Sequence, residues 1–431
     1  MRPLYSPRED CRLCGARDFD LVIDLGELAL TGRFPAPADP PVPVAPLRVH
    51  KCRGCHLVQL AHDFDRDALF RQTYGYRSGI NRTMTEHLHG IADTAMALAR
   101  PRPGDLVLDI GSNDATLLKR YPAQLQRIGI DPTIAQYDAF YPEGAWRVAD
   151  FFSADAFRSV AGDGQARIVS SIAMLYDLPD LHAFTADLAS ILAPDGVWVF
   201  EQSYLPSMLA TNAYDTICHE HLLYLSLDSI GRLLAEHGLR VFHAELNDSN
   251  GGSSRIFACH RDASHATTPE LARLQAAEAA LALDSLQPYV AFRDRVDRLR
   301  DRIRAFLESA RDQGLRVHGY GASTKGNTTL QHCGIGPELI EAIADRNPSK
   351  DGRITPATRI PIVSEAASRA ARPDIYFVLP WHFKAEFVER EAEFLAGGGQ
   401  LVFPLPDFEV VSRAGAGPGS GEDGPAGGSA A

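Results

Sequence analysis

The sequence has no apolar run that approaches the roughly 20 residues of a membrane-spanning helix. The first residues, Met1 to Pro7, contain no apolar stretch of the kind that marks a secretory signal peptide. We therefore expect no membrane partner and a location in the reducing cytoplasm.

An excess of positive charge is also missing. The 43 Lys and Arg residues are outnumbered by 55 Asp and Glu residues, which gives a net charge of −12. Binding to nucleic acid gains affinity from basic side chains that displace counterions, and no basic stripe with interleaved aromatics is present. We expect no nucleic-acid partner. With 431 residues, 45% of them hydrophobic, the chain is long enough for two or three domains.

Three familiar signatures are incomplete. The glycine loop around Gly111 lacks the GxGxxG of dinucleotide folds, and the loop at 319–326 lacks the P-loop spacing, so ATP hydrolysis is not predicted. In His219-Glu-His221 the histidines are two residues apart, whereas HExxH zinc sites space them by four. A catalytic zinc is not predicted there.

Cysteines are few, but four of the seven form two pairs with the same spacing, Cys11-Arg-Leu-Cys14 and Cys52-Arg-Gly-Cys55. In a reducing compartment such pairs indicate metal before disulfides. Four thiolates complete a tetrahedral zinc shell and leave no open position, so we predict a structural zinc site. Four unrelated free thiols are the alternative, and His56 is expected to be a bystander.

Strands and helices alternate in two long segments, which predicts an α/β fold with parallel sheets covered on both faces. The expected parts are a zinc-binding module at 1–65, an α/β domain at 66–265, a long connecting helical segment at 266–313, a second α/β domain at 314–413 and a disordered tail at 414–431. The predicted strands are Leu106–Ile110, Gln126–Ile130, Ile168–Ser171, Val197–Glu201, Leu239–Glu245 and Arg255–His260, then Arg316–Tyr320, Ile340–Ala344, Ile375–Val378 and Gln400–Phe403.

The first α/β segment contains a candidate cofactor loop. Gly111 ends an apolar strand, and a residue without Cβ lets a ligand approach the backbone at the start of a helix. Asp131 ends the next strand, where ribose hydroxyls need an acceptor, although a helix cap is an alternative. The spacing favours S-adenosylmethionine (SAM) over NAD. The predicted SAM-binding residues are Gly111, Asn113, Asp114, Asp131, Asp150 and Phe151.

A polar cluster with acid–base chemistry follows. Cys218, His219, Glu220, His221 and Tyr224 lie among apolar residues. Histidine is the natural base near neutral pH, and a carbon beside a carbonyl can lose a proton to such a base and form an enolate. The alternative is a set of hydrogen-bonded core histidines.

The second α/β segment begins with a glycine loop that contains Lys325. Exposed backbone N–H groups and this lysine suit a diphosphate, while a purely structural turn is the alternative. Trp381 and His382 end a later strand and are expected to line the same crevice, although Trp381 also suits a buried structural role.

These features resemble a known family, the bacterial SAM-dependent sugar C-methyltransferases that build branched-chain deoxysugars on nucleotides. The resemblance runs from about Cys11 to Pro406. Besides the cysteine pairs, its motifs are Tyr74-Gly-Tyr-Arg-Ser-Gly79, Asp109-Ile-Gly-Ser-Asn-Asp114, Asp215-Thr-Ile-Cys-His-Glu-His221, Asn250-Gly-Gly-Ser253, Gly319-Tyr-Gly-Ala-Ser-Thr-Lys-Gly326, Asp345-Arg-Asn-Pro348 and Pro380-Trp-His-Phe383.

The resemblance implies a zinc-binding N-terminal module followed by two Rossmann-like, doubly wound domains, a class I methyltransferase core and a C-terminal domain. It implies a nucleotide-linked 4-ketosugar substrate that is deprotonated and methylated beside the ketone. His221 would be the base, Glu220 would hold its imidazole, and Tyr76 or Tyr224 would donate to the enolate oxygen. The implied substrate-binding residues are Tyr74, Ser78, Gly251, Lys325 and His382.

Two departures from the family pattern leave the sugar open. Cys218 stands where relatives often have tyrosine, and Tyr176 or Asp177 lies where some have an active-site histidine. One rival hypothesis is an O- or N-methyltransferase on the same scaffold. Another is a non-catalytic, zinc-bearing scaffold protein, for which Ala115 in place of a loop glycine leaves some room.

Overall fold

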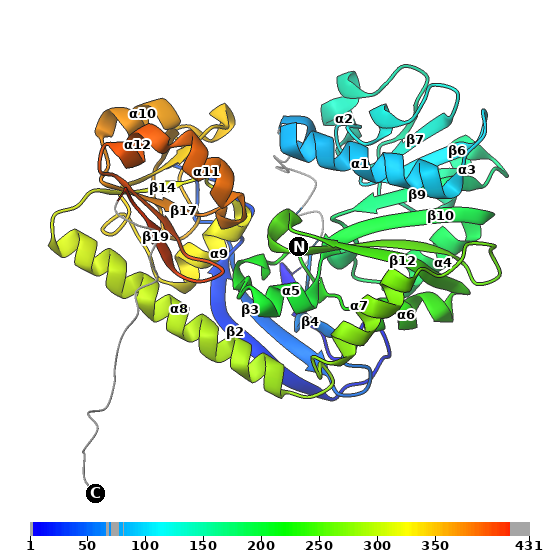
Figure 1. The fold of residues 1–431 in the computed structure, drawn as a ribbon, viewed down its shortest axis with the longest axis horizontal. Helices are drawn as coiled ribbons and strands as arrows, with labels where there is room; N and C mark the ends of the chain where they lie inside the picture. Colours follow the sequence, from blue (N-terminus) through cyan, green and yellow to red (C-terminus); the bar gives the residue numbers. More distant parts are fainter. Residues whose placement is uncertain (1–2, 66–68, 70–76, 81, 414–431) are drawn as a thin grey trace, which may run out of the picture.

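The computed structural model of the chain describes residues 3–65, 69, 77–80 and 82–413. We refer to residues 3–65 as the N-terminal module, to 77–80 and 82–265 as the central part, and to 314–413 as the C-terminal part. Figure 1 shows the central and C-terminal parts side by side, with the strands of the N-terminal module extending between them. The α/β fold class is confirmed. Among the described residues, no helix is long and apolar enough to cross a membrane.

The N-terminal module is built on an antiparallel sheet with the strand order β11-β4-β3-β2. Its strands are β2 (Phe19–Ala29), β3 (Val44–Cys52), β4 (Val58–Leu60) and β11 (Leu223–Tyr224), and a separate pair is formed by β1 (Tyr5–Pro7) and β5 (His62–Phe64). The strand β11 comes from the central part and directly follows the His-Glu-His segment. The module therefore extends beyond the predicted boundary at residue 65.

The central sheet has the order β12-β13-β10-β9-β6-β7-β8 and is parallel except for β13, which runs antiparallel to both of its neighbours. Its strands are β6 (Leu106–Ile110), β7 (Gln126–Ile130), β8 (Trp146–Val148), β9 (Ala166–Ile172), β10 (Leu192–Ser203), β12 (Leu239–Asn247) and β13 (Ser253–His260). In β6, Val107 to Ile110 are all buried, as expected for a parallel strand with helices on both faces. The predicted strands β6 and β7 are confirmed.

Helices cover this sheet. They are α1 (Arg82–Ala99), α2 (Ile134–Tyr137), α3 (Ala154–Ala161), α4 (Leu181–Ile191), α5 (Leu205–Ala210) and α6 (Leu227–Glu236). In α1 the buried residues Leu88, Ile91, Ala92 and Ala95 recur at helix spacing, so one face of the helix packs on the sheet.

The connecting helical segment is divided into two helices. It consists of α7 (Pro269–Ala279) and α8 (Gln287–Asp312), separated by a turn in which Ala282 has a positive φ of 50°. Pro288 explains the interruption, since proline is tolerated in the first turn of a helix but not in its interior. Figure 1 shows α8 running beneath the module toward the C-terminal part.

The C-terminal part is a second parallel sheet, with the order β16-β15-β14-β17-β18-β19 and an antiparallel edge at β19. Its elements are β14 (Val317–Tyr320), α9 (Thr324–His332), β15 (Ala342–Asp345), β16 (Ile362–Ser364), α10 (Glu365–Ala371), β17 (Ile375–Val378), α11 (Lys384–Arg390), α12 (Ala392–Ala396), β18 (Gln400–Phe403) and β19 (Glu409–Val411). The predicted strands β17 and β18 are confirmed. The short β16 and β19 were not predicted.

Short 3₁₀ helices connect these elements. They are η2 (Ser78–Ile80), η3 (Leu118–Arg120), η4 (Asp138–Phe140), η5 (Leu175–Asp177), η6 (Tyr214–Thr216), η7 (Ser249–Gly251), η8 (Pro348–Lys350) and η9 (Trp381–Phe383). One cluster of buried hydrophobic residues includes members from all three parts, such as Leu47, Phe200 and Phe377. The three parts therefore share a core, and their junction is held in a fixed arrangement. The predicted tail at 414–431 lies outside the described residues.

Candidate active site

A cavity of about 1510 Å³ opens where the three parts meet. Sites for one drug-sized ligand have volumes of roughly 300–1,000 Å³, so this cavity has room for a cofactor and a second molecule. Residues from all three parts line it, among them Phe34, Gly111, Tyr176, His221, Lys325 and Lys350.

The Gly111 turn forms one wall of the cavity. Gly111 has a positive φ of 72°, and its N–H donates to the carbonyl of Ile130 at 2.9 Å. A Cβ at this position would meet only Met174, at an ordinary contact distance of 3.6 Å, so no protein group fills the space beside the turn. This open backbone fits a ligand that approaches closely, as predicted for SAM.

Asp131 lies behind the turn and holds its shape. One carboxylate oxygen accepts the N–H of Asn113 at 2.9 Å, and the other accepts the N–H of Thr133 at 2.6 Å. Neither Asp131 nor Asn113 is among the residues that line the cavity. Asp131 therefore joins the Gly111 turn to the turn before α2, and it is not the N-cap of that helix, which is Thr133. Contact with a ribose remains a prediction.

Asn113 and Asp114 fasten a neighbouring segment onto the turn. The Asn113 side-chain oxygen accepts the N–H of Ser78 at 3.0 Å, and the Asp114 carboxylate accepts the N–H of Gly79 at 3.0 Å. Gly79 is required there because a Cβ would lie 2.6 Å from that carboxylate. Ser78 lines the cavity, while Asn113 and Asp114 support it from behind.

Two further predicted cofactor-binding residues, Asp150 and Phe151, are not among the residues that line the cavity. The Asp150 carboxylate accepts the N–H of Phe151 at 2.8 Å. Their contact with an adenine stays a prediction. Tyr74 and Tyr76 lie outside the described residues.

His221 lines the same cavity as the Gly111 turn. Its Nδ1 donates to the carbonyl of Thr216 at 2.8 Å, a bond that leaves Nε2 as the basic nitrogen of a neutral imidazole. Burial lowers the pKa of His221 to about 3, with a further contribution from the positive charge of Lys325. The ring of Tyr176 lies against it, with 4.2 Å between centroids. His221 is thus an anchored, neutral proton acceptor.

Glu220 does not hold the imidazole as predicted, because the neighbouring His221 is anchored by Thr216 instead. The Glu220 carboxylate faces the N-terminal module, where a Cβ on Gly32 would lie 2.4 Å from it. One of its oxygens is buried without a hydrogen-bond partner, and burial raises the pKa of Glu220. A buried carboxyl with a spare oxygen is suited to a ligand hydroxyl.

The N-terminal module fixes the position of this acid–base segment. Immediately after it, Leu223 and Tyr224 pair with β4 of the module. Within it, a ring nitrogen of His219 hydrogen-bonds the carbonyl of Ala45 at 3.3 Å. His219 is therefore a structural histidine.

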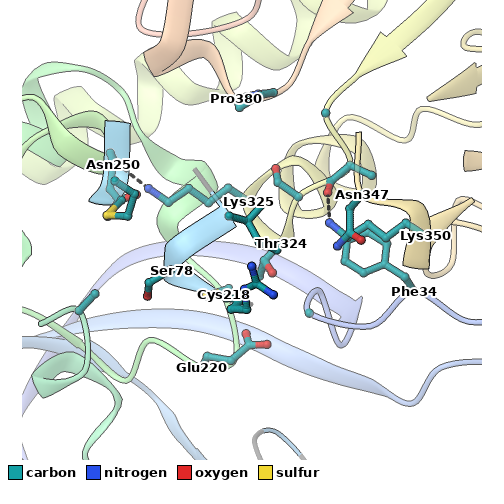
Figure 2. A pocket seen from close by; sticks show the side chains of 18 of the residues that line it. Phe34, Ser78, Cys218, Glu220, Asn250, Thr324, Lys325, Asn347, Lys350 and Pro380 are labelled. Carbon is teal, nitrogen blue, oxygen red and sulfur yellow. Dashed lines mark hydrogen bonds between the residues drawn. The ribbon is translucent and has the colours of Figure 1, made fainter. Parts of the chain in front are cut away.

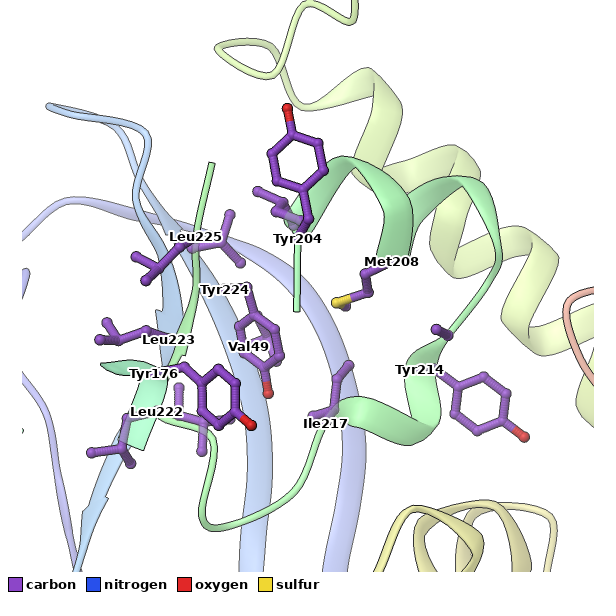
Figure 3. Packing of buried hydrophobic residues seen from close by; sticks show 14 of the residues in the cluster. Val49, Tyr176, Tyr204, Met208, Tyr214, Ile217, Leu222, Leu223, Tyr224 and Leu225 are labelled. Atoms are coloured by element: carbon purple, nitrogen blue, oxygen red, sulfur yellow. The ribbon is translucent and has the colours of Figure 1, made fainter. Parts of the chain in front are cut away.

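Two tyrosines near the acid–base segment lie in different surroundings. Tyr224 is buried in the module sheet with its hydroxyl unpartnered, and it does not line the cavity. Tyr176 lines the cavity and contacts His221. Figure 3 shows both in one cluster of buried residues beside Leu222 and Leu223. A contact between Tyr224 and a ligand stays a prediction, and Tyr176 is a further candidate.

The C-terminal part contributes Lys325 and His382 to the cavity, as predicted. Gly251 does not line it. Trp381 packs on Gly251 so closely that a Cβ would lie 2.8 Å from its ring, and the Trp381 indole donates to Asp215 at 2.8 Å. Gly251 and Trp381 therefore lock the central and C-terminal parts together.

The four paired cysteines converge, as predicted. Their sulfurs all lie within 4.8 Å of one another, with Cys11 to Cys55 at 3.5 Å and Cys14 to Cys52 at 3.6 Å. A tetrahedral zinc with bonds of about 2.3 Å places its sulfurs about 3.8 Å apart, so these side chains fit the ion.

Several cavity residues were missed from the sequence. Gln202 is 2% exposed, and both polar atoms of its amide lack a partner. Its place at the carboxyl end of a parallel strand was a usable signal. Glu201, bonded to His87 and Arg255, is another. Phe34 lies in a proline-rich loop that offered no signal.

Comparisons with known proteins agree with this geometry. Family profiles match residues 11–70 ("Putative zinc binding domain"), 81–244 ("Methyltransferase domain") and 248–406 ("C-methyltransferase C-terminal domain"). The chain is 33% identical to the C-methyltransferase NovU of Streptomyces niveus over 416 residues, which cover 96% of this chain and 99% of NovU.

Solved structures of methyltransferases are also similar to part of this chain. Magnesium protoporphyrin IX methyltransferase of Synechocystis with bound SAM matches with a TM-score of 0.31 and 16% identity, covering 42% of this chain and 82% of that chain. A SAM-dependent methyltransferase of Clostridium acetobutylicum matches with a TM-score of 0.33 and 11% identity, covering 41% of this chain and 92% of that chain.

Proposed function

The chain belongs to the family of zinc-bearing, SAM-dependent C-methyltransferases, and we propose that its substrate is a nucleotide-linked 4-ketosugar. The methyl group would be added to a carbon beside the ketone. SAM is the methyl donor, and Zn²⁺ is held by Cys11, Cys14, Cys52 and Cys55. A reducing cytoplasm, where these thiolates stay available to the metal, is the proposed location.

The main observation behind the proposal is the hydrogen bonding of His221 and its place in the cavity. Its Nδ1 is engaged by the Thr216 carbonyl, and the residue lines the same cavity as the open Gly111 turn. A carbon acid needs a neutral base at a fixed position, and an anchored imidazole meets both requirements. We assign to His221 the removal of the proton beside the ketone.

The cofactor wall supports the donor side of the reaction. Gly111 and Ser112 would contact SAM directly, while Asn113, Asp114 and Asp131 hold the turn in shape. When bound, SAM supplies a methyl group on a positively charged sulfur that leaves readily.

The opposite wall supports sugar recognition. Glu220 and Gln202 have buried polar atoms without a protein partner, which suit the hydroxyl groups of a sugar. Tyr176, whose ring contacts His221, is a further candidate for contact with the reacting sugar, and Ser78 also lines the cavity. The remaining length of the cavity accommodates a nucleotide.

The test is a pair of variants assayed by mass spectrometry with SAM and a panel of nucleotide-linked 4-ketosugars. His221→Asn should bind SAM in calorimetry as the parent does, yet lose about 10²–10⁴-fold in methyl transfer. His265→Asn is the matched control, because that histidine bonds the Asp195 carbonyl outside the cavity.

Three results would count against the proposal. Near-normal turnover by His221→Asn would remove His221 as the base. A product methylated on oxygen or nitrogen would favour the O- or N-methyltransferase alternative. Turnover of none of the panel would exclude the 4-ketosugar class.

A further inference from the structure

Lys325 is a partly buried lysine without a counter-ion at contact distance among the described residues. It stands in the first turn of α9 and lines the cavity. Its Nζ donates to the carbonyl of Asn250 at 2.6 Å, and within the described part of the chain it forms no ion pair. An ammonium group has three donors, so two remain for a ligand. A cation in this setting is suited to an anionic oxygen.

Lys325, His221 and His382 line the same cavity. Burial lowers the pKa values of both histidines, and the positive charge of Lys325 lowers them further. Burial also lowers the pKa of Lys325 itself, a shift that Asp215 partly offsets.

The loop that precedes Lys325 is a poor cradle for the phosphates it was predicted to bind. Backbone N–H groups of a phosphate loop must face the ligand. Here the N–H of Gly321 donates to Ala344 at 2.8 Å, and that of Ala322 donates to Asp345 at 2.8 Å. The space beside Gly321 is filled by Pro380, which a Cβ would approach to 2.7 Å.

A second group of cations offers the phosphates another place. Lys350 lies 4.5 Å from the centroid of the Phe34 ring, and Arg346 and Arg353 line the same end of the cavity. Figure 2 shows Lys325 reaching toward Asn250, with Lys350 and Phe34 on the opposite side. The two lysines therefore serve different parts of one long ligand.

We propose that Lys325 is a catalytic residue that holds the oxygen of the enolate, an inference that rests on the proposed function. His221 takes the proton of the carbon beside the ketone. The C–H electron pair then forms a carbon–carbon double bond, and the carbonyl π pair moves onto oxygen, where Lys325 donates to it. The carbon–methyl bond forms as the sulfur–methyl bond of SAM breaks, its electron pair stays on sulfur, and the carbonyl is restored. The proton on His221 then passes to solvent.

The experiment measures wash-out of deuterium from the carbon beside the ketone, with S-adenosylhomocysteine in place of SAM so that only proton removal is followed. The substrate is whichever 4-ketosugar nucleotide the parent enzyme methylates. Lys325→Met should slow wash-out and kcat by about 10²–10³-fold, the usual cost of losing one oxyanion donor. Inhibition by the free nucleoside diphosphate should be unchanged.

Lys350→Met is the matched control from the other end of the cavity. It should raise KM and weaken inhibition by the nucleoside diphosphate. If Lys325→Met instead weakens nucleoside diphosphate inhibition and keeps a normal wash-out rate, Lys325 is a phosphate ligand and the proposal is overturned.

Lys325→Gln protects the test against a folding defect, because its amide can still donate to Asn250 while lacking the charge. It should show the same slow wash-out with normal SAM binding, and parent-like wash-out in this variant would also overturn the proposal. If the proposed function itself is wrong, the result is different, because the parent enzyme would then wash out no deuterium.

Discussion

The two parallel sheets present glycine turns of the same construction to one cavity. Gly111 and Gly321 each have a positive φ, and each donates its N–H to the residue before the acid that ends the neighbouring strand. Those acids, Asp131 and Asp345, each accept one backbone N–H from the turn and another from the residue two positions beyond themselves.

The turns differ in what stands in front of them. The space beside Gly111 is open, whereas Pro380 fills the space beside Gly321. The first turn can therefore receive a ligand against its backbone, while the second positions a side chain, Lys325. Two turns with the same backbone geometry can therefore have different roles, because the residues in front of each turn determine whether a ligand can reach its backbone.

Zinc removal should have the largest effect on turnover. It should disturb the region of the Gly321 turn and leave the Gly111 turn intact. The second turn leads into α9, where Asn327 donates to the Thr31 carbonyl of the module at 2.7 Å. The acid–base segment also depends on the module through the pairing of β11 with β4. Treatment with a chelator, or Cys55→Ser, should abolish turnover.

SAM affinity should change little on zinc removal, because the Gly111 turn is held by Asp131 within the central sheet. Calorimetry with SAM provides this measurement, and restored turnover after zinc is added back is the control. Full turnover without zinc would show that the module does not position the acid–base segment.

Matched glycine substitutions test the comparison directly. Gly111→Ala puts a methyl group where the cofactor approaches and should weaken SAM binding. A displacement of about 1 Å in a bound ligand can also lower the reaction rate on the order of 100-fold. Gly321→Ala meets Pro380 instead and should cost about 1–3 kcal/mol of stability with SAM affinity retained. Thermal unfolding and SAM titration measure the two effects. Equal losses of SAM affinity in both variants would contradict the distinction between the turns.

The two acids provide a milder version of the same test. Asp131→Asn and Asp345→Asn each weaken hydrogen bonds to backbone N–H groups, which should lower stability by about 1–3 kcal/mol in both cases. Only Asp131→Asn should weaken SAM binding, and only Asp345→Asn, whose side chain lines the cavity, should raise KM for the sugar nucleotide. Weaker SAM binding in Asp345→Asn, or a raised KM for the sugar nucleotide in Asp131→Asn, would contradict the different roles of the two turns.

The smallest effect concerns pH. Because burial and Lys325 lower the pKa of His221 to about 3, its imidazole is neutral throughout pH 5–8, and its protonation should cause no fall in kcat/KM there. Lys325→Met removes a positive charge and should move the pKa of His221 upward. Nuclear magnetic resonance of the ring, assigned with His221→Asn, measures both values. A pKa near 6.5 in the parent would contradict this account of the environment.

Much of the fold could be predicted because its signals are local. Apolar strands such as Leu106–Ile110 and the paired cysteines are visible in short windows of sequence. The break in the connecting segment was signalled by Pro288, yet the helical pattern on either side outweighed it. The strand β11 could not be predicted, since two residues form a strand only when β4 is available as a partner.

The site was predictable in its parts but not in its contacts. His221 was found from its motif, whereas its anchoring by Thr216 depends on the 3₁₀ turn at 214–216. Tyr224 was predicted to face the ligand, but its place in the module sheet depends on the pairing of β11 with β4, which the sequence does not show. Phe34 and Lys350 are more than 300 residues apart and meet only through tertiary packing.

The most direct test of the central claim is a crystal structure with S-adenosylhomocysteine and the methylated product. The account predicts that Nε2 of His221 lies about 3–3.5 Å from the carbon that carries the new methyl group, with the cofactor sulfur facing that carbon from the Gly111 turn. A product carbon beyond reach of His221, or a methyl group bonded to oxygen, would contradict it.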